Sequence, residues 1–288
     1  MTRLATVIVP TWNRKEQVDD LLRKLLLEQT GVDFDVVVAD DGSNDGTVDH
    51  LASGIQSLPA TLQDRVRLLS LPHAGVASTR NRAALATSTP WLIFLDSDDR
   101  PDESWAATLM GSCTMDHDLV SIAVRRVTPD RRSTVVEPTA AGPAFGGVEA
   151  LWLAGAFAIR RTLFDEVGGY CDGLAFAENT DLALRVAARN ERRRVRTAID
   201  PTPHVNIVVR DGRYDPVVQL ESAEAILELH SDRLDLEPKL RSNYEAIAGV
   251  AAHRLGDRAR ARDHLRAAVR SHPSRLKHHA RLARAVLP

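Results

Sequence analysis

The feature that most constrains the fold is a series of short apolar runs without polar alternation. Residues 6–9 (TVIV), 36–39 (VVVA) and 91–95 (WLIFL) are such runs, and a strand with one wet face would alternate instead. The segment 18–26 between the first two has leucines and a valine at helical spacing. This order predicts an α/β fold, with mostly parallel strands buried on both faces and flanked by helices. The other expected elements are helices near 47–57, 77–86 and 182–188, strands at 66–71 and 119–127, regular structure at 152–160 and a loop at 128–147.

Polar clusters follow three of the expected strands. They are Thr11-Trp12-Asn13, Asp40-Asp41-Gly42 and Asp96-Ser97-Asp98. In open α/β sheets ligands bind beyond the carboxyl ends of the strands. The three clusters therefore predict one shared binding site.

The densest cluster is the acidic run after the strand at 91–95. Asp96, Asp98 and Asp99 lie within four positions, so their charges repel one another unless a cation is present. Mg²⁺ and Mn²⁺ bind carboxylate oxygens and complete their coordination with water and substrate phosphates. A divalent metal on a diphosphate is therefore the expected ligand of Asp96 and Asp98.

Five ordered motifs resemble those of family 2 glycosyltransferases. They are VIVPTWNR, VVVADDGSNDGT, HAGVASTRNRA, FLDSDDRP and the pair GAFAIRRTLFDEVGGY and FAENTDLALR, which together span roughly residues 4–210. The resemblance implies the GT-A fold, which is Rossmann-like. It also implies a nucleotide-diphospho-sugar donor, a divalent metal (Mn²⁺ or Mg²⁺) and transfer with inversion. A UDP-sugar is the first expectation for the donor, with dTDP- and GDP-sugars as alternatives.

The resemblance also implies roles on the donor side. Asp41 matches the acid that hydrogen-bonds the nucleobase, with Asp40 as runner-up, and Arg80 matches an arginine that reaches the base or the diphosphate. Three residues match the first loop, which lies against the nucleotide: Pro10, Thr11 and Asn13.

The metal side follows from the same resemblance. Asp96 and Asp98 match the Asp-x-Asp motif of the family, with Asp98 the stronger metal candidate and Ser97 between them at the donor. His204 matches a histidine that helps to hold the metal or the diphosphate in some relatives.

The chain departs from the family pattern at Asn179. The segment reads Glu178-Asn179-Thr180-Asp181-Leu182, where the family has an acid that acts as general base at the second position. An amide cannot accept the proton of an acceptor hydroxyl. Three interpretations stay open: Glu178 or Asp181 replaces the base, the acceptor is already an anion, or the chain binds sugars without transferring them.

The C-terminal part differs in character from the rest. We expect a nucleotide-sugar domain at 1–215 and a helical extension at 216–288. Five small or turn residues of the extension have the offsets of a tetratricopeptide repeat: Gly249, Gly256, Ala261, Ala268 and Pro273. One repeat cannot bury its own face, so it must pack on the first domain or on a partner.

Charge is distributed unevenly between the two parts. The net charge is −2, but residues 241–288 carry eleven basic and three acidic residues. The basic end could bind an acidic partner or a membrane surface, form a homodimer through its helices, or simply be a solvated face. Nucleic acid is not an expected partner.

Composition places the chain among soluble proteins. No apolar run reaches the 18–20 residues that span a bilayer, and two cysteines form no disulfide framework, so we expect a cytoplasmic protein, with peripheral membrane association open. The leading hypothesis is a hexosyltransferase-like glycosyltransferase acting on a small molecule, glycan or peptide. The alternative is a non-catalytic sugar or sugar-nucleotide binding protein.

Overall fold

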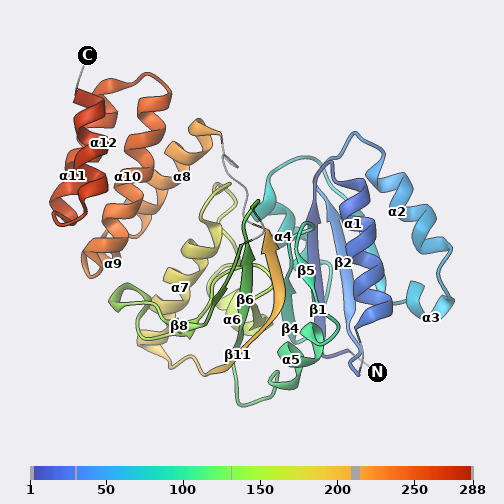
Figure 1. Ribbon diagram of the computed structural model, residues 1–288. Coiled ribbons are helices and arrows are strands. Elements are labelled where there is room, and N and C mark those ends of the chain that lie inside the picture. Colours follow the sequence, from blue (N-terminus) through green and yellow to red (C-terminus); the bar gives the residue numbers. More distant parts are fainter. Residues whose placement is uncertain (1–2, 30, 131, 209–214, 287–288) are drawn as a thin grey trace.

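A nine-stranded sheet forms the centre of the molecule (Figure 1). The computed structural model describes residues 3–29, 31–130, 132–208 and 215–286. The strand order is β3-β2-β1-β4-β10-β6-β11-β5, with β7 paired to β6. The first four strands in sequence are parallel to one another: β1 (Ala5–Thr11), β2 (Asp35–Asp40), β3 (Val66–Ser70) and β4 (Trp91–Phe94).

The second half of the sheet is mixed. β10 (Phe157–Arg160) runs antiparallel between β4 and β6 (Leu119–Val127), and β11 (Thr197–Val208) returns parallel to β6. Two short strands pair antiparallel to these: β5 (Arg100–Pro101) with β11 and β7 (Ser133–Val136) with β6. The predicted α/β class is confirmed, and strict parallel order is limited to the N-terminal half.

Both faces of the sheet are covered, which explains the continuous apolar runs. Successive residues of β1 enter different cores, with Val7 and Val9 in one and Ile8 in the other. The first face carries α1 (Lys15–Arg23), α2 (Thr47–Gln56) and α5 (Trp105–Gly111). α1 continues as the π-helical turn η1 (Lys24–Glu28), and the short α3 (Ala60–Gln63) follows α2. The second face carries α4 (Val76–Leu85), α6 (Arg161–Glu166) and α7 (Glu178–Arg192).

The segment expected as a loop at 128–147 contains regular structure. Besides β7 it holds β8 (Thr139–Ala140), which pairs with β9 (Glu149–Ala150), and the 3-10 turn η2 (Pro143–Phe145). The loop prediction was therefore wrong here. The strand β7 was missed because three of its four residues are exposed, so it has no apolar pattern to detect.

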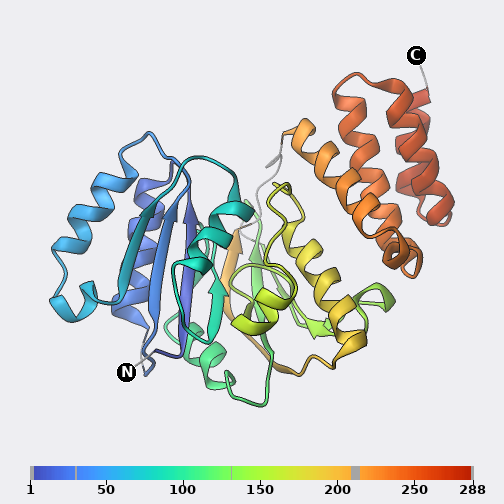
Figure 2. The ribbon, with the colours of Figure 1, turned by 180° about the vertical axis from the view of Figure 1, so that it is seen from behind.

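The C-terminal helices form a bundle with its own core, beside α7 and at the opposite end of the molecule from α2 (Figures 1 and 2). The helices are α8 (Pro216–Leu229), α9 (Ser231–Asp235), α10 (Pro238–Arg254), α11 (Arg258–Ser271) and α12 (Leu276–Val286). α10 and α11 form the predicted hairpin, and a Cβ on Gly249 would lie 2.7 Å from Leu265 Cγ. Their apolar face does not stand alone, because Leu174 and Phe176 of the first domain join this core. The domain boundary after residue 215 stays a prediction, and residues 209–214 lie outside the described ranges.

Candidate active site

The parallel register brings the predicted strand ends together. Thr11 is the register partner of Asp40, and the Asp41 amide donates to the Thr11 carbonyl at 2.9 Å. On the other side of β1, the Leu95 amide donates to the Ile8 carbonyl at 3.0 Å. The loops after β1, β2 and β4 therefore leave the sheet at one common edge.

The first loop is fixed by Asn13. Its backbone is left-handed at φ 50°, its amide donates to Ser43 Oγ at 2.8 Å, and its side-chain oxygen accepts from the Asn44 amide at 2.9 Å. Asparagine tolerates this conformation better than most residues. Pro10 and Thr11, which also match the first-loop motif, are buried in β1. They therefore support the start of the loop from within the sheet.

Trp12 is an aromatic surface that the sequence motif did not single out. Its side chain is 52% exposed and stacks on the His73 ring, with centroids 4.7 Å apart and planes 26° from parallel. The ring pair lies beside Asp41, because His73 Nδ1 is 2.9 Å from Asp41 Oδ2. An exposed tryptophan next to a carboxylate is suited to a flat heterocycle that also donates a hydrogen bond.

Asp41 organises the loop that precedes α4. Its carboxylate accepts from the backbone amides of Ala74 at 2.8 Å and Gly75 at 3.0 Å. A carboxylate has about four lone-pair directions, so these bonds leave capacity for a ligand donor. Asp40 is fully buried and accepts from the Ser43 amide at 2.9 Å, which makes it part of the turn.

Arginines from distant segments face the acids that follow β4. Arg14 Nη1 lies 3.0 Å from Asp98 Oδ1 and 3.3 Å from Ser97 Oγ, and Arg80 Nη2 lies 2.6 Å from Asp96 Oδ1. Ser97 and Asp98 are nearly buried, and so is Asp99. The cation that the acidic run required is thus supplied in part by the chain itself. Arg14 was not identified as a site residue from the sequence, although it is the last residue of the first motif.

Arg80 joins the two halves of the site. Its side chain is 1% exposed, its Nη1 donates to Glu178 Oε1 at 2.8 Å, and its guanidinium carbon lies 5.1 Å from the centre of the Tyr170 ring. Burial alone lowers the pKa of Arg80, but the charges of Asp96 and Glu178 outweigh burial and raise it. Arg80 is therefore a permanent cation between two carboxylates.

Asn179 is the second residue of α7 and belongs to a small hydrogen-bond network. Its Nδ2 donates to Glu178 Oε1 at 3.2 Å, and its Oδ1 accepts from the Tyr170 hydroxyl at 3.0 Å. Burial raises the pKa of Tyr170, so this hydroxyl stays protonated. Asn179 thus orients Glu178 and has no proton-accepting role.

Asp181 is buried and accepts hydrogen bonds from His230 and Arg185. It is 1% exposed, its Oδ1 accepts from His230 Nε2 at 2.9 Å, and its Oδ2 accepts from Arg185 Nε at 3.0 Å. Burial raises the pKa of this carboxyl, but the hydrogen bonds from His230 and Arg185 outweigh burial and lower it. Of the two acids predicted to replace the base, Glu178 lies in the network of Arg80 and Asp181 lies in a separate one.

His204 lies on β11 and contacts Asp102. Its Nδ1 is 3.0 Å from Asp102 Oδ2, and the two residues that follow it pair with β5. The structure thus gives His204 a carboxylate partner of its own, and its predicted role at the metal or diphosphate stays a prediction.

The fit of a divalent metal can be judged from the donor atoms. Asp96 and Asp98 offer carboxylate oxygens, the type that Mg²⁺ and Mn²⁺ bind. In the described part of the chain no group of three or more His, Cys, Asp or Glu side chains is arranged to hold a metal ion. Two carboxylates fit a metal that takes its remaining ligands from a diphosphate and water, and they do not form a protein-only cage.

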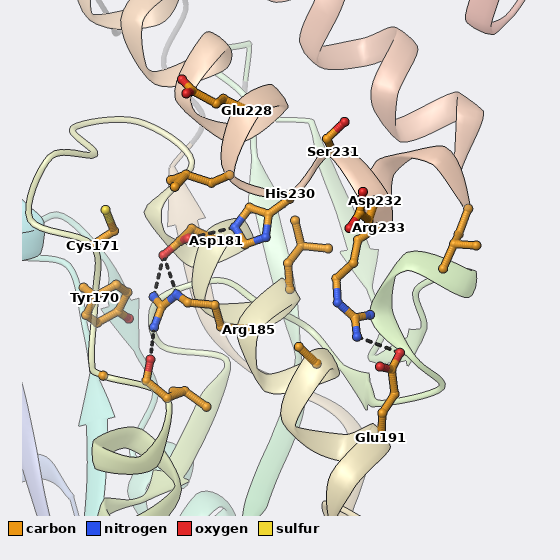
Figure 3. Close-up of a pocket in the computed structure, with 16 residues that line it drawn as sticks. Tyr170, Cys171, Asp181, Arg185, Glu191, Glu228, His230, Ser231, Asp232 and Arg233 are labelled. Carbon is orange, nitrogen blue, oxygen red and sulfur yellow. Dashed lines mark hydrogen bonds and ion pairs between the residues drawn. The ribbon is translucent and has the colours of Figure 1, made fainter.

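A separate cavity of about 780 Å³ lies between α7 and the α8–α9 turn (Figure 3). Its walls include Tyr170, Asp181, Arg185, His230 and Arg233. It shares Tyr170 with the strand-end site, because the Tyr170 ring also contacts Arg80. The cavity therefore lies where the C-terminal helices contact the rest of the chain.

The comparison with known families agrees with this geometry. The model of glycosyl transferase family 2 matches residues 6–179, which is more than half of the chain. The chain belongs to glycosyl transferase family 2. This family 2 glycosyltransferase is 26% identical over 198 residues to an uncharacterized glycosyltransferase of Haemophilus influenzae, covering 64% of this chain and 62% of the relative. It is 38% identical over 99 residues to validoxylamine A glucosyltransferase of Streptomyces hygroscopicus subsp. jinggangensis, covering 33% of this chain and 22% of that protein.

Solved structures share the fold over nearly the whole chain. S. aureus TarS 1–349 in complex with UDP-GlcNAc superposes with a TM-score of 0.63 at 18% identity, covering 99% of this chain and 89% of that one. Mannosyltransferase PcManGT from Pyrobaculum calidifontis, in complex with GDP-Man and Mn²⁺, superposes with a TM-score of 0.62 at 19% identity, covering 99% and 86%. The predicted GT-A glycosyltransferase fold with C-terminal helices is confirmed. Every helix in the described ranges is too short or too polar to cross a bilayer.

Proposed function

We propose that this family 2 glycosyltransferase moves a sugar from a nucleotide-diphospho-sugar to an acceptor, with inversion and with Mn²⁺ or Mg²⁺. The observation that carries the proposal is the buried bridge through Arg80, which contacts Asp96 at 2.6 Å and Glu178 at 2.8 Å. It links the acids suited to a metal–diphosphate with the acid suited to an acceptor. The TarS complex with UDP-GlcNAc and the PcManGT complex with GDP-Man and Mn²⁺ support a nucleotide-sugar and a metal here.

The donor would lie across the ends of β1, β2 and β4. Trp12 offers a stacking surface for the base, and Asp41 offers a carboxylate for its N–H. Asp96 and Asp98 would hold the metal, which would stabilise negative charge on the leaving diphosphate. The cations of Arg14 and Arg80 are placed to add to that stabilisation.

Glu178 is the proposed general base. It is 8% exposed, stands at the first position of α7 and is oriented by Arg80 and Asn179. Its carboxylate would accept the proton of the acceptor hydroxyl as the oxygen attacks the anomeric carbon from the face opposite the diphosphate. Attack from that face gives inversion. Asp181 is less suited, because His230 and Arg185 occupy its oxygens.

A second candidate is a binding protein that keeps the donor site without transfer. The observation that favours it is the commitment of Glu178 Oε1 to Arg80 and Asn179. With this oxygen already accepting from two donors, the arrangement could also hold an acceptor without reacting.

A donor screen tests the proposal. Thermal shift is measured with UDP-, GDP- and dTDP-sugars in Mn²⁺ or in EDTA, and any hit is followed for transfer or hydrolysis. We expect stabilisation by one nucleotide class that requires the metal, with UDP first. No metal-dependent stabilisation by any of the three would overturn the donor assignment.

A further inference from the structure

We infer that the C-terminal helices position the turn that carries Glu178, with His230 and Tyr244 as the positioning residues. The inference rests on the proposed role of Glu178 in transfer. Three independent contacts support it, and all of them converge on residues 174–181.

The first contact is a buried hydrogen bond between the two parts of the chain. His230 lies at the end of α8, and its Nε2 donates to Asp181 Oδ1 at 2.9 Å (Figure 3). His230 is 8% exposed and Asp181 is 1% exposed, so solvent does not compete for this bond. Asp181 is one turn from Glu178 on α7, and this bond therefore fixes the start of the helix.

The second contact involves the neighbouring residue of the same turn. Tyr244 of α10 is 6% exposed, and the Thr180 side chain is near enough to its hydroxyl to lower a pKa that burial raises. Two adjacent residues of the turn are thus held by two different helices of the extension. Glu178 itself is held from the opposite side by Arg80.

The third contact is apolar and supports an unfavourable backbone. Ala177, directly before Glu178, has φ 65°, in the left-handed region that alanine rarely adopts. Leu174, Phe176 and Ala177 pack into the core formed by the C-terminal helices. Such a conformation is unfavourable for alanine and persists only where its surroundings impose it. Here the extension supplies part of those surroundings.

The consequence is that the extension sets where the Glu178 carboxylate points. A displacement of about 1 Å in a reacting group can lower the rate by about 10²-fold, whereas donor affinity depends on other contacts. Loss of the contacts from His230 and Tyr244 should therefore lower kcat and leave the KM for the donor nearly unchanged.

The test compares His230→Ala, His230→Gln and Tyr244→Phe in the full chain. Glutamine places its Nε2 where it can still donate to Asp181. His253→Ala is the matched control, because His253 lies on α10 in another cavity, lined by residues of the C-terminal helices alone. We measure kcat, donor KM and hydrogen exchange of the peptide covering 174–185.

We expect His230→Ala to lower kcat about 10- to 100-fold, with donor KM within about twofold. Exchange in 174–185 should become faster, and His230→Gln should restore most of both properties. Wild-type kcat and wild-type exchange in His230→Ala would overturn the inference. So would faster exchange throughout the chain with loss of donor binding, since that reports general unfolding.

The exchange measurement separates this inference from the proposed function. If the wild-type protein transfers no sugar, the proposed function fails. Exchange in 174–185 then still decides whether His230 and Tyr244 hold the turn. Faster exchange in His230→Ala and Tyr244→Phe supports this role, and unchanged exchange in both refutes it.

Discussion

Single residues decide how the site tolerates so much negative charge. Three acids follow β4, and Glu178 approaches from α7, yet all four are nearly buried or half-buried. Arg80 contacts Asp96 and Glu178 together, so it offsets two charges that would otherwise repel. Removing one partner of a buried ion pair costs about 3–5 kcal/mol, because the remaining charge is left uncompensated.

Arg80→Gln should therefore destabilise the protein by about 3–5 kcal/mol as well as abolish transfer. The measurement is urea unfolding followed by circular dichroism. Arg82→Gln is the control on the same helix, since its Nη1 donates to the Pro72 carbonyl at 3.3 Å at the surface, and it should unfold like the wild type. Equal stability of both variants would show that Arg80 does not hold the site together.

Asn179→Asp distinguishes the two candidate functions. The new carboxylate would lie where the amide now donates to Glu178 at 3.2 Å, and two like charges at that distance raise the pKa of one of them. We expect turnover at neutral pH to stay level or fall several-fold. A rise of tenfold or more would favour the binding protein that has lost its base.

The sequence predicted the acids of the site better than their partners. Asp96, Asp98 and Asp41 could be predicted to lie together, because parallel strands end at one edge. Arg80 was expected at the donor from its motif, but its pairing with Asp96 and Glu178 was not, and Arg14 was not identified. One partner of Asp181, His230, is 49 positions away, and tertiary packing brings them together.

Among the elements, the C-terminal helices are joined by a half-buried histidine. His264 of α11 has Nδ1 2.7 Å from Glu245 of α10 and Nε2 2.9 Å from Glu224 of α8. Arg260 also pairs with Glu224. The hydrogen bond to Glu245 raises the pKa of His264 above 6.5 and outweighs the burial that lowers it, and the bond to Glu224 acts in the same direction.

The extension should therefore lose stability as the pH rises above about 6.5. A raised folded pKa gives stabilisation that is full below the unfolded pKa and is lost as pH passes the folded pKa. Burial lowers the pKa of His278 to about 4, so His278 is neutral in this window and does not oppose the trend. Urea midpoints from pH 6.5 to 8.5 should fall in the wild type and in His253→Gln, and the fall should be smaller in His264→Gln. The same slope in all three would refute this role.

The α10–α11 contact depends on one glycine. A Cβ at Gly249 would lie 2.7 Å from Leu265 Cγ and 3.1 Å from the Ala261 carbonyl, so the helices would have to separate. Gly249→Val should cost about 1–3 kcal/mol through overpacking. Gly111→Ala is the control, because its Cβ meets nothing within 4 Å, and thermal unfolding should distinguish the two variants. Equal thermal unfolding midpoints would show that α10 and α11 can separate without loss of stability.

At the scale of the whole molecule, the N-terminal half was predictable and the rest was less so. The runs at β1, β2 and β4 are apolar on both faces, and this pattern has one common solution, a covered parallel sheet. β10 has four residues and reverses direction, and β7 is exposed, so the sequence pattern predicts the pairing of neither strand. The contacts of His230 and Tyr244 with residues 174–181 form only when the extension packs beside α7.

The most direct test of the central proposal is UDP affinity by calorimetry, in Mn²⁺ and in EDTA, for the wild type and Asp98→Asn. Asp98 lies in the buried cluster at the strand ends, and the half-exposed Asp102 provides the control Asp102→Asn. We predict that Mn²⁺ tightens UDP binding about tenfold or more in the wild type and the control, equal to about 1.4 kcal/mol or more, and has no effect in Asp98→Asn. Equal affinity with and without Mn²⁺ in the wild type would contradict a metal-dependent nucleotide-sugar site.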